Sequence, residues 1–409
     1  MKVLLINAGS SSLKYQLIDM DNEKVIAKGN CERVGLAKPF ITYKHNGQSM
    51  QFDGAKDHED AVQKVLAILT NKDYGVLKSL AEIDVVGHRV LQGGWIYKES
   101  VVVDAKVMKN LEKLVPIGPL HMPGNIAGIK ACQAAMPKVP QVATFDTAFH
   151  ATMPEKAYLY PIRYEDSQKY HIRKYGFHGS SHRFITLETA KLLKKPVEET
   201  NIIVCHLGNG SSLSAVQNGK SVDTTMGLTP LQGLMMGSRS GDVDPTVVQY
   251  LCHNKNISVD EAITYLNKQS GLLGVSGVDS DMRSVEMAAA EGNKRCQLAL
   301  DMLCYAARKH LGSYLAVVKN LDAIVFTGGI GENGAEPREA IAGDLDHLGI
   351  VLDKEKNRNF TRGEVQLISA KNSKVKIYII PTNEELMIAR DAKALVDAKA
   401  CKKCGKKAK

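Results

Sequence analysis

The sequence contains no long hydrophobic run and no leader-like start. No apolar run in its 409 residues approaches the length of a membrane span. The apolar run after Lys2 is only four residues long before it meets Asn7, which is too short for a signal peptide. These absences predict a cytoplasmic protein with no membrane partner.

Cysteine pairs with metal-ligand spacing are also scarce. Cys401 and Cys404 form one C-x₂-C pair with no second pair near it, whereas a structural zinc site needs four ligands. We therefore expect no metal site there. The other six cysteines lie in apolar or helical patterns, as reduced and buried thiols do: Cys31, Cys132, Cys205, Cys252, Cys296 and Cys304.

The excess of positive charge comes mostly from one end of the chain. The formal net charge is +9, and residues 399–409 hold six lysines and no acid, so the remainder carries 9 − 6 = +3. That value is close to neutral for a chain of this size. We expect residues 399–409 to be a disordered, solvated tail and expect no nucleic-acid partner.

Composition and length indicate a globular protein of two domains. Hydrophobic residues make up 44% and charged residues 24% of a chain that is long for one core. Strand and helix patterns alternate, which predicts α/β architecture, and no low-complexity linker separates the halves. The expected helices are 58–71, a helical stretch within 285–320 and 384–398; the expected strands are 83–87, 139–145, 321–326 and 376–380.

Two similar strand–turn–strand segments stand about 200 residues apart. In Val3–Leu17 and in Asn201–Val216, a buried strand meets a turn of Gly, Ser and Asn, and a second strand follows. Turns of small residues expose backbone N–H groups that suit polyphosphate, although an ordinary β-hairpin would use the same residues. The repetition favours a duplication in which a nucleotide is held between two similar domains. The motif is neither a P-loop nor a dinucleotide fingerprint.

Three further polar motifs lie at or near expected strand and helix ends, where open α/β sheets bind ligands. Thr327–Asn333 is glycine-rich after a strand, which suits a base or phosphate, or else forms a tight β-to-α turn. Arg239 stands in a Gly/Ser loop as an anion clamp or as a surface ion-pair partner. His178 stands between glycines, where it contacts a phosphoryl group or caps a helix.

Taken in order, six sequence blocks resemble the acetate and propionate kinase family of the sugar kinase/Hsp70/actin superfamily. The similarity runs from residue 1 to about residue 398, and the tail has no counterpart in the family pattern. The blocks are Asn7–Lys14, Phe145–His150, Tyr175–Gly179, Met226–Asp242, Gly328–Asn333 and Pro381–Leu386.

The resemblance implies two duplicated actin-like (ribonuclease H-like) α/β domains with an interdomain nucleotide cleft. The N-terminal domain, on the acetate and phosphoryl side, would hold residues 1–147 with 385–398. The C-terminal domain, residues 148–384, would bind nucleotide and form a homodimer.

The resemblance also implies an activity and a set of roles. The family transfers the γ-phosphoryl group of ATP to acetate by direct in-line transfer, giving acetyl phosphate and ADP reversibly, with Mg²⁺ or Mn²⁺. Catalysis would fall to Asp146, His178 and Arg239. Substrate binding would fall to Arg89, Leu91, Leu120, His121, Phe177 and Pro230. Nucleotide binding would fall to Ser10, Ser12, Lys14, His206, Leu207, Gly208, Asn209, Gly210, Asp281, Met282, Arg283, Gly329, Ile330, Gly331, Glu332 and Asn333. The metal would be held by Asn7 and Glu384.

Some positions depart from the family pattern and leave alternatives open. Leu91-Gln92 stands where Val-His is common, and Met122 follows His121 where Asn is common. The larger leucine predicts a tighter acyl pocket that favours acetate, with a propionate or short-chain fatty acid kinase as the alternative. A chaperone-like ATPase would need a peptide-binding domain for which no residues remain. A non-catalytic ATP-binding protein would lack some of Arg89, Asp146, His178, Arg239 and Glu384, and all five are present.

Overall fold

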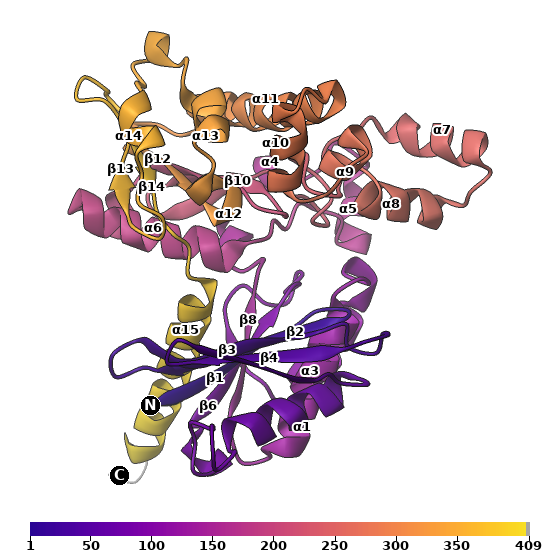
Figure 1. Cartoon of the computed structure of the whole chain (residues 1–409), viewed down its shortest axis with the longest axis vertical. Coiled ribbons are helices and arrows are strands. Elements are labelled where there is room, and N and C mark those ends of the chain that lie inside the picture. The colour runs from indigo at the N-terminus through magenta and orange to yellow at the C-terminus, as the bar shows by residue number, and fades with distance from the viewer. Residues whose placement is uncertain (406–409) are drawn as a thin grey trace. The chain divides into compact units, whose positions relative to one another are not determined.

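The computed structural model describes residues 1–405 and divides into two compact units (Figure 1). Unit 1 contains Met1–Phe149 together with the chain from Asn383 onward, and unit 2 contains His150–Thr382. The predicted boundaries, 1–147 with 385–398 and 148–384, put Glu384 in the second domain. In the structure Glu384 opens the last helix and belongs to unit 1.

Unit 1 is built on an eight-stranded sheet in the order β5-β4-β3-β2-β1-β6-β8-β7. Strands β1 to β5 form antiparallel hairpins, and β6 and β8 continue the sheet in parallel with β1. The strands are β1 (Lys2–Ala8), β2 (Ser12–Asp19), β3 (Lys24–Glu32), β4 (Phe40–His45), β5 (Gln48–Asp53), β6 (Val85–Val90), β7 (Val101–Val102) and β8 (Gln141–Phe145). The helices are α1 (His58–Leu69), α2 (Ala105–Lys113), α3 (Met122–Ala135) and α15 (Glu384–Gly405).

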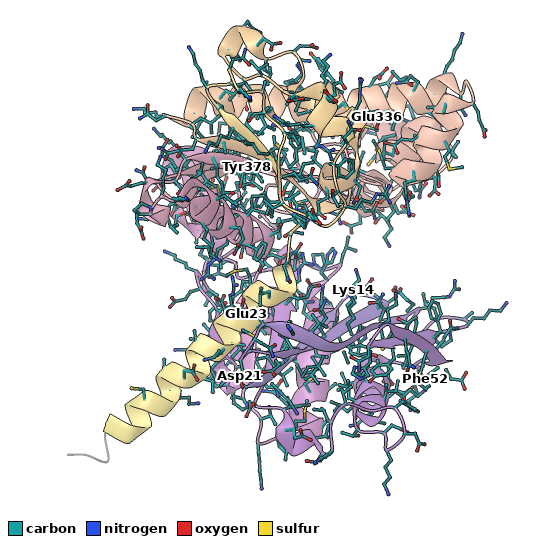
Figure 2. The ribbon with its side chains drawn as sticks, turned by 60° about the vertical axis from the view of Figure 1, so that its left-hand side comes forward. Lys14, Asp21, Glu23, Phe52, Glu336 and Tyr378 are labelled. Atoms are coloured by element: carbon teal, nitrogen blue, oxygen red, sulfur yellow. The ribbon has the colours of Figure 1, made fainter. Side chains whose placement is uncertain are left out.

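Helices cover the two faces of this sheet unequally. Helices α1 and α3 close one face over a core that includes Leu4, Ile6 and Leu13. On the other face α15 packs against β1 and β6, where Ile388 and Ala392 face Gly87. Arg390 also binds Glu23 of the β2–β3 turn, which Figure 2 shows beside this helix. Helix α15 also contacts β2 on this face.

Unit 2 repeats the same plan. Its sheet has the order β11-β10-β9-β12-β14-β13, and β9 pairs antiparallel with β10 and parallel with β12. The series β11-β10-β9-β12-β14 therefore has the pairing senses of β3-β2-β1-β6-β8 in unit 1. The strands are β9 (Ile202–His206), β10 (Ser212–Gln217), β11 (Lys220–Thr224), β12 (Ala323–Thr327), β13 (Gln366–Leu367) and β14 (Lys376–Ile379).

The helices of unit 2 flank its sheet. Helix α11 packs on β9 and β10 above a core that includes Ile203 and Leu213, and α6 contacts β9 and β12; Figure 1 shows the two helices on opposite sides of the strands. The helices are α4 (Glu155–Tyr158), α5 (Tyr164–Tyr170), α6 (Gly179–Leu193), α7 (Pro245–Lys255), α8 (Val259–Lys268), α9 (Gly271–Ser276), α10 (Met282–Ala290), α11 (Lys294–Val317), α12 (Gly328–Asn333), α13 (Ala335–Ala342) and α14 (Lys354–Arg358).

The predicted α/β class is confirmed, and both predicted hairpins are present as β1–β2 and β9–β10. The tail prediction is wrong for residues 399–405, because α15 continues to Gly405. Alanine and lysine are good helix formers, and no Gly or Pro stands between Glu384 and Gly405. Residues 406–409 of the predicted tail lie outside the described residues. Within residues 1–405, no helix is long and apolar enough to cross a membrane.

Candidate active site

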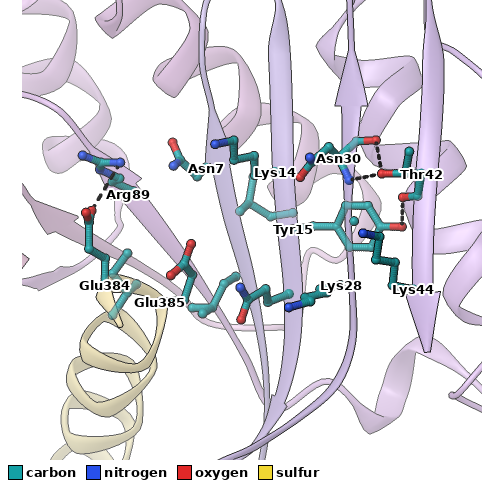
Figure 3. Close-up of a pocket in the computed structure, with 15 residues that line it drawn as sticks. Asn7, Lys14, Tyr15, Lys28, Asn30, Thr42, Lys44, Arg89, Glu384 and Glu385 are labelled. Atoms are coloured by element: carbon teal, nitrogen blue, oxygen red, sulfur yellow. Dashed lines mark hydrogen bonds and ion pairs between the residues drawn. The ribbon is translucent and has the colours of Figure 1, made fainter. Parts of the chain in front are cut away.

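A pocket of about 360 Å³ opens on unit 1 where three elements end or begin (Figure 3). Asn7 lies near the end of β1, Arg89 near the end of the neighbouring parallel strand β6, and Glu384 at the start of α15. Lys14, which faces Asn7 across the β1–β2 ladder, lines the same pocket. Because β1 and β6 run parallel, their carboxyl ends meet at one sheet edge, where open α/β sheets place ligand sites.

Arg89 is held between carboxylates. Its Nε donates to Asp146 Oδ1 at 2.9 Å and its Nη2 to Asp146 Oδ2 at 2.8 Å, while Nη1 lies 3.4 Å from Glu384 Oε2. The side chain of Asp146 is 1% exposed and that of Arg89 is 26% exposed. Burial lowers the pKa of Arg89, but Asp146 and Glu384 outweigh it, so the net shift of this pKa is upward. The guanidinium is therefore permanently charged and fixed in one plane.

The six predicted substrate-binding residues are not grouped around this pocket. Arg89 lines it, whereas Leu91, Leu120 and His121 do not. Leu91 instead packs into the core beneath β6 and α3, and its backbone N–H donates to Asn125 Oδ1 at 2.9 Å. Leu120 is 45% exposed. The remaining two, Phe177 and Pro230, belong to unit 2.

The serine turn of the first hairpin is closed by its own backbone. Gly9 N–H donates to the Ser12 carbonyl at 2.8 Å, and a ring nitrogen of His58 lies 2.7 Å from the Gly9 carbonyl oxygen. Neither Ser10 nor Ser12 lines the pocket that contains Lys14. Among the predicted nucleotide contacts of unit 1, the structure thus places only Lys14 in this pocket.

A second pocket, of about 560 Å³, lies on unit 2 beside the turn between β9 and β10. Eight of its lining residues are among the predicted nucleotide-binding residues: Gly208, Asn209, Asp281, Met282, Arg283, Gly329, Ile330 and Asn333. Five more line it that sequence reasoning missed: Leu272, Ser280, Glu286, Gly334 and Arg362. Residues from four distant chain segments therefore meet in one pocket that contains glycines and charged side chains.

The other predicted nucleotide-binding residues do not line this pocket, and Leu207 and Glu332 are among those with structural partners. Leu207 is fully buried, donating its N–H to the Thr327 carbonyl and accepting from Ile330 N–H. Glu332 Oε1 accepts from the backbone N–H of Gly328 at 2.9 Å and of Thr382 at 3.1 Å. These contacts fix the turn after β12. His206, Gly210 and Gly331 also lie outside the pocket lining.

Two cationic or polar side chains converge on Gly210 in the same turn. A Cβ placed on Gly210 would lie 3.3 Å from His178 Nε2 and 3.7 Å from Arg239 Nη1. Arg239 Nη1 donates to the Pro230 carbonyl at 3.2 Å, and within residues 1–405 no ion pair joins Arg239 to a carboxylate. Burial lowers the pKa of Arg239. A half-buried guanidinium without a carboxylate beside it has unused capacity for an anion.

His178 caps the N-terminus of α6 with a left-handed backbone (φ 58°), and a chain of polar groups holds its ring. Its Nδ1 and the Nε2 of His182 each lie 2.8 Å from the Ser212 hydroxyl. His182 is fully buried, and burial holds its pKa well below the ordinary value. The His206 ring lies 4.4 Å from the His178 ring, between centroids. This arrangement orients His178 Nε2 toward the glycine turn.

Oxygen donors for a cation are present in the unit 1 pocket. Asn7 and Glu384 both line it. No cluster of three or more His, Cys, Asp or Glu side chains that could hold a metal ion occurs in the described part of the chain. Mg²⁺ characteristically binds through one or two carboxylates, water and substrate phosphates, so an amide and a carboxylate suit it.

Comparisons with known proteins agree on one family. The model of the acetokinase family matches residues 2–390. The acetate kinase of Thermoanaerobacter pseudethanolicus is 53% identical over 400 residues, covering 97% of this chain and 99% of the relative. The acetate kinase of Clostridium novyi is 52% identical over 398 residues, covering 97% and 99%.

Two solved structures are similar over nearly the whole chain. A crystal structure of Porphyromonas gingivalis acetate kinase has a TM-score of 0.92 at 42% identity and covers 97% of this chain and 99% of that chain. A crystal structure of a propionate kinase from Francisella tularensis has a TM-score of 0.90 at 41% identity and covers 96% and 99%.

Proposed function

The chain belongs to the acetokinase family, and we infer from this premise that it transfers the γ-phosphoryl group of ATP reversibly to acetate, giving acetyl phosphate and ADP. The observation that carries this conclusion is the identity of about half of all residues to acetate kinases along nearly the full length of both chains. The fold is the duplicated actin-like α/β fold of the family. The enzyme is a kinase whose acceptor is a carboxylate.

We propose that Arg89 binds the acetate carboxylate. Its guanidinium offers a rigid, planar set of donors that match a carboxylate, and Asp146 locks the plane through two hydrogen bonds. Asp146 is buried and bonded to Arg89, which supports a positioning role rather than contact with substrate. A bound carboxylate nucleophile needs no separate strong base, so catalysis depends on placing it in line with the phosphoryl group.

Arg239 and His178 are proposed to stabilise the phosphoryl group in transfer. The transition state carries negative charge on equatorial oxygens, and preorganised donors stabilise it without reorganisation. Arg239, which has no carboxylate partner among the described residues, and His178, held by Ser212, both point toward the β9–β10 turn. Gly208 and Asn209 of that turn would hold nucleotide phosphates. Asp281 to Arg283 and Gly329 to Asn333 would hold the ribose and adenine.

A Mg²⁺ ion, or Mn²⁺, is proposed to bind through Glu384 and Asn7. When bound, the ion would neutralise charge on the nucleotide phosphates. Glu384 Oε2 also lies 3.4 Å from Arg89 Nη1, so the negative charge of this carboxylate affects the electrostatic potential at the acetate site even without metal. Lys14 adds a positive charge on the same pocket.

Propionate is the second candidate acceptor, because a propionate kinase structure is nearly as similar to this chain as an acetate kinase structure. A hydroxamate assay with ATP and Mg²⁺ across acetate, propionate and butyrate tests both. We expect the highest kcat/KM with acetate. A preference for propionate would make the second candidate the correct one, and no acyl phosphate with any acid would refute the kinase assignment.

We further propose that unit 2 forms a homodimer. Helix α11 presents Leu298, Met302 and Tyr305, which are 52%, 43% and 70% exposed and follow helical spacing. Exposed apolar stripes of this kind are typical of protein interfaces.

We also propose a cytoplasmic location. Every cysteine side chain described in the structure is a free thiol, as expected in a reducing compartment.

A further inference from the structure

Beside α15, the sheet of unit 1 carries two cross-strand rows of polar side chains. In one row Asn7 pairs with Lys14, Lys14 with Asn30 and Asn30 with Thr42. In the next row Gln16 pairs with Lys28, and Lys28 pairs with Lys44. All of these residues line the 360 Å³ pocket, as Figure 3 shows for most of them.

Lys14, Lys28 and Lys44 are exposed, and none forms an ion pair or side-chain hydrogen bond with another described residue. Lysines directly opposite each other on antiparallel strands have Cβ atoms about 5 Å apart, and like charges at that spacing are destabilising. Diagonal neighbours such as Lys14 and Lys28 lie about 7–8 Å apart. Three ammonium groups on flexible stems can therefore reach one small anion.

Two ordinary explanations for these lysines do not apply. Lysines often protect sheet edges from pairing, but β2, β3 and β4 are inner strands of the eight-stranded sheet. Surface lysines also often pair with acids, but the acids that line this pocket, Glu384 and Glu385, stand at its α15 end. Glu384 is already engaged by Arg89. The lysine end of the pocket is thus a region of uncompensated positive charge.

We propose that Lys28 and Lys44, with Lys14 at the border, bind a small phosphate-bearing anion at the end of this pocket away from Arg89 and Glu384. The whole pocket, which also contains Arg89 and Glu384, has the volume of a small-molecule site rather than of a flat surface for a macromolecule. The carboxylates at the α15 end repel a polyanion and confine it to the lysines. Asn30 and Gln16 place amide groups beside that position, where they suit phosphate or hydroxyl oxygens.

Calorimetric titration of the full-length protein, saturated with Mg²⁺ and a non-hydrolysable ATP analogue, tests this proposal. One arm uses inorganic phosphate and the other a hexose bisphosphate. Binding of inorganic phosphate supports a free-phosphate ligand, and binding of the bisphosphate alone supports a sugar-borne one. If neither binds while the nucleotide site is filled, the proposal is wrong.

The double variant Lys28→Gln/Lys44→Gln is expected to weaken anion binding by about tenfold or more, the effect of losing one charge-assisted contact. The matched control is Lys106→Gln/Lys109→Gln on α2, which removes the same charge from two exposed lysines outside the pocket. The control is expected to bind within twofold of the parent. Equal weakening of anion binding in both double variants would show that the overall positive charge of the protein, and not this site, attracts the anion, and would overturn the proposal.

A second measurement guards against a misfolded variant. Without anion and at low salt, Lys28→Gln is expected to raise the melting temperature, because it removes a like-charge pair, and to abolish the rise that the anion causes in the parent. Kinase activity with ATP and acetate is expected to stay within twofold. Loss of anion binding is thereby separated from failure of the proposed function.

Discussion

At the scale of single residues, the two central arginines differ in what surrounds them. Arg89 is held by Asp146 and lies near Glu384, whereas Arg239 has a backbone carbonyl and a thioether as its neighbours. A guanidinium fixed by carboxylates is suited to positioning a monoanion. A guanidinium without carboxylate neighbours is suited to stabilising negative charge that develops during the reaction. This contrast assigns binding to the first and transition-state stabilisation to the second.

Arg239→Ala is expected to lower kcat by about 10²–10³-fold while changing the KM for acetate much less, because it removes an interaction made mainly in the transition state. Arg239→Lys is expected to restore activity only in part, since it keeps charge but loses the planar fork. Steady-state kinetics with varied acetate measures both. Near-normal kcat in the alanine variant would mean that the phosphoryl group is stabilised elsewhere.

Asp146→Asn is expected to raise the KM for acetate by about tenfold, because Arg89 loses the charge that locks its plane. Arg89→Ala is expected to raise KM further and also to lower kcat, because a misplaced nucleophile reacts poorly. In the double variant the two effects should be far from additive if Asp146 acts through Arg89. Fully additive effects would show that Asp146 contacts substrate independently.

Leu91→Ala is expected to improve propionate relative to acetate, by about 10–200-fold in the ratio of kcat/KM values if it opens room for one methylene. Because Leu91 packs against the core near Gly118, this variant also loses stability, and a melting curve accompanies the kinetics. Unchanged selectivity in a folded variant would place Leu91 outside the acyl pocket. Because Leu91 does not line the pocket of Arg89 in the structure, this variant tests whether the acyl group extends beyond that pocket toward Leu91.

At the scale of elements, hairpins and strand ends could be predicted because their signals are local. The β1–β2 and β9–β10 turns follow from small residues between apolar runs, and α1 follows from its amphipathic spacing and the Asp57 cap. The hydrogen bonds between Asp146 and Arg89 form because β6 and β8 are parallel neighbours in the sheet. The sequence of neither segment shows that the two strands are neighbours.

What the sequence did not reveal depends on register or on distant loops. Lys28 and Lys44 lie opposite each other only in one register of β3 and β4. The alternation of apolar and polar residues along the two strands does not by itself specify that register. Arg362 joins the unit 2 pocket from a loop without any motif. The Ser212 hydroxyl between His178 and His182 requires β10 to lie beside the start of α6.

The apolar stripe of α11 carries a prediction at this scale. Tyr305→Glu is expected to convert the dimer to a monomer, because it places a charge at the most exposed residue of the stripe. Tyr164→Glu on α5 is the matched control, since Tyr164 is 56% exposed and lies away from α11 in the sequence. Sedimentation velocity measures the mass of each. A parent that is already monomeric, or a Tyr305 variant that stays dimeric, would contradict the proposed interface.

At the scale of the whole molecule, the two units share one topology and each buries histidine in neutral form. His88 in unit 1 and His150 in unit 2 are 2% and 0% exposed, and burial lowers the pKa of each to about 4. Their ring nitrogens have fixed partners, Gln141 for His88 and Ser221 with the Phe177 carbonyl for His150. Both units therefore lose stability when acid protonates these histidines.

The sign of the pH effect follows from linkage. An unfolded histidine has a pKa near 6.5, so between pH 6.5 and about 4 the unfolded chain binds protons that the folded chain does not. The free energy of unfolding is therefore expected to fall as pH falls through this window. From pH 7 to pH 5 the loss is about 2 kcal/mol for each such histidine.

Calorimetric unfolding between pH 7 and pH 5 tests this expectation. His88→Gln keeps a side-chain N–H that can donate to Gln141 but removes the titrating group. We expect the pH dependence of unfolding to decrease by about 2 kcal/mol over that range in this variant, because the unfolded state loses one proton-binding site. A variant with the parent's pH dependence would mean that His88 is protonated in the folded protein, and that burial of the ring does not hold it neutral.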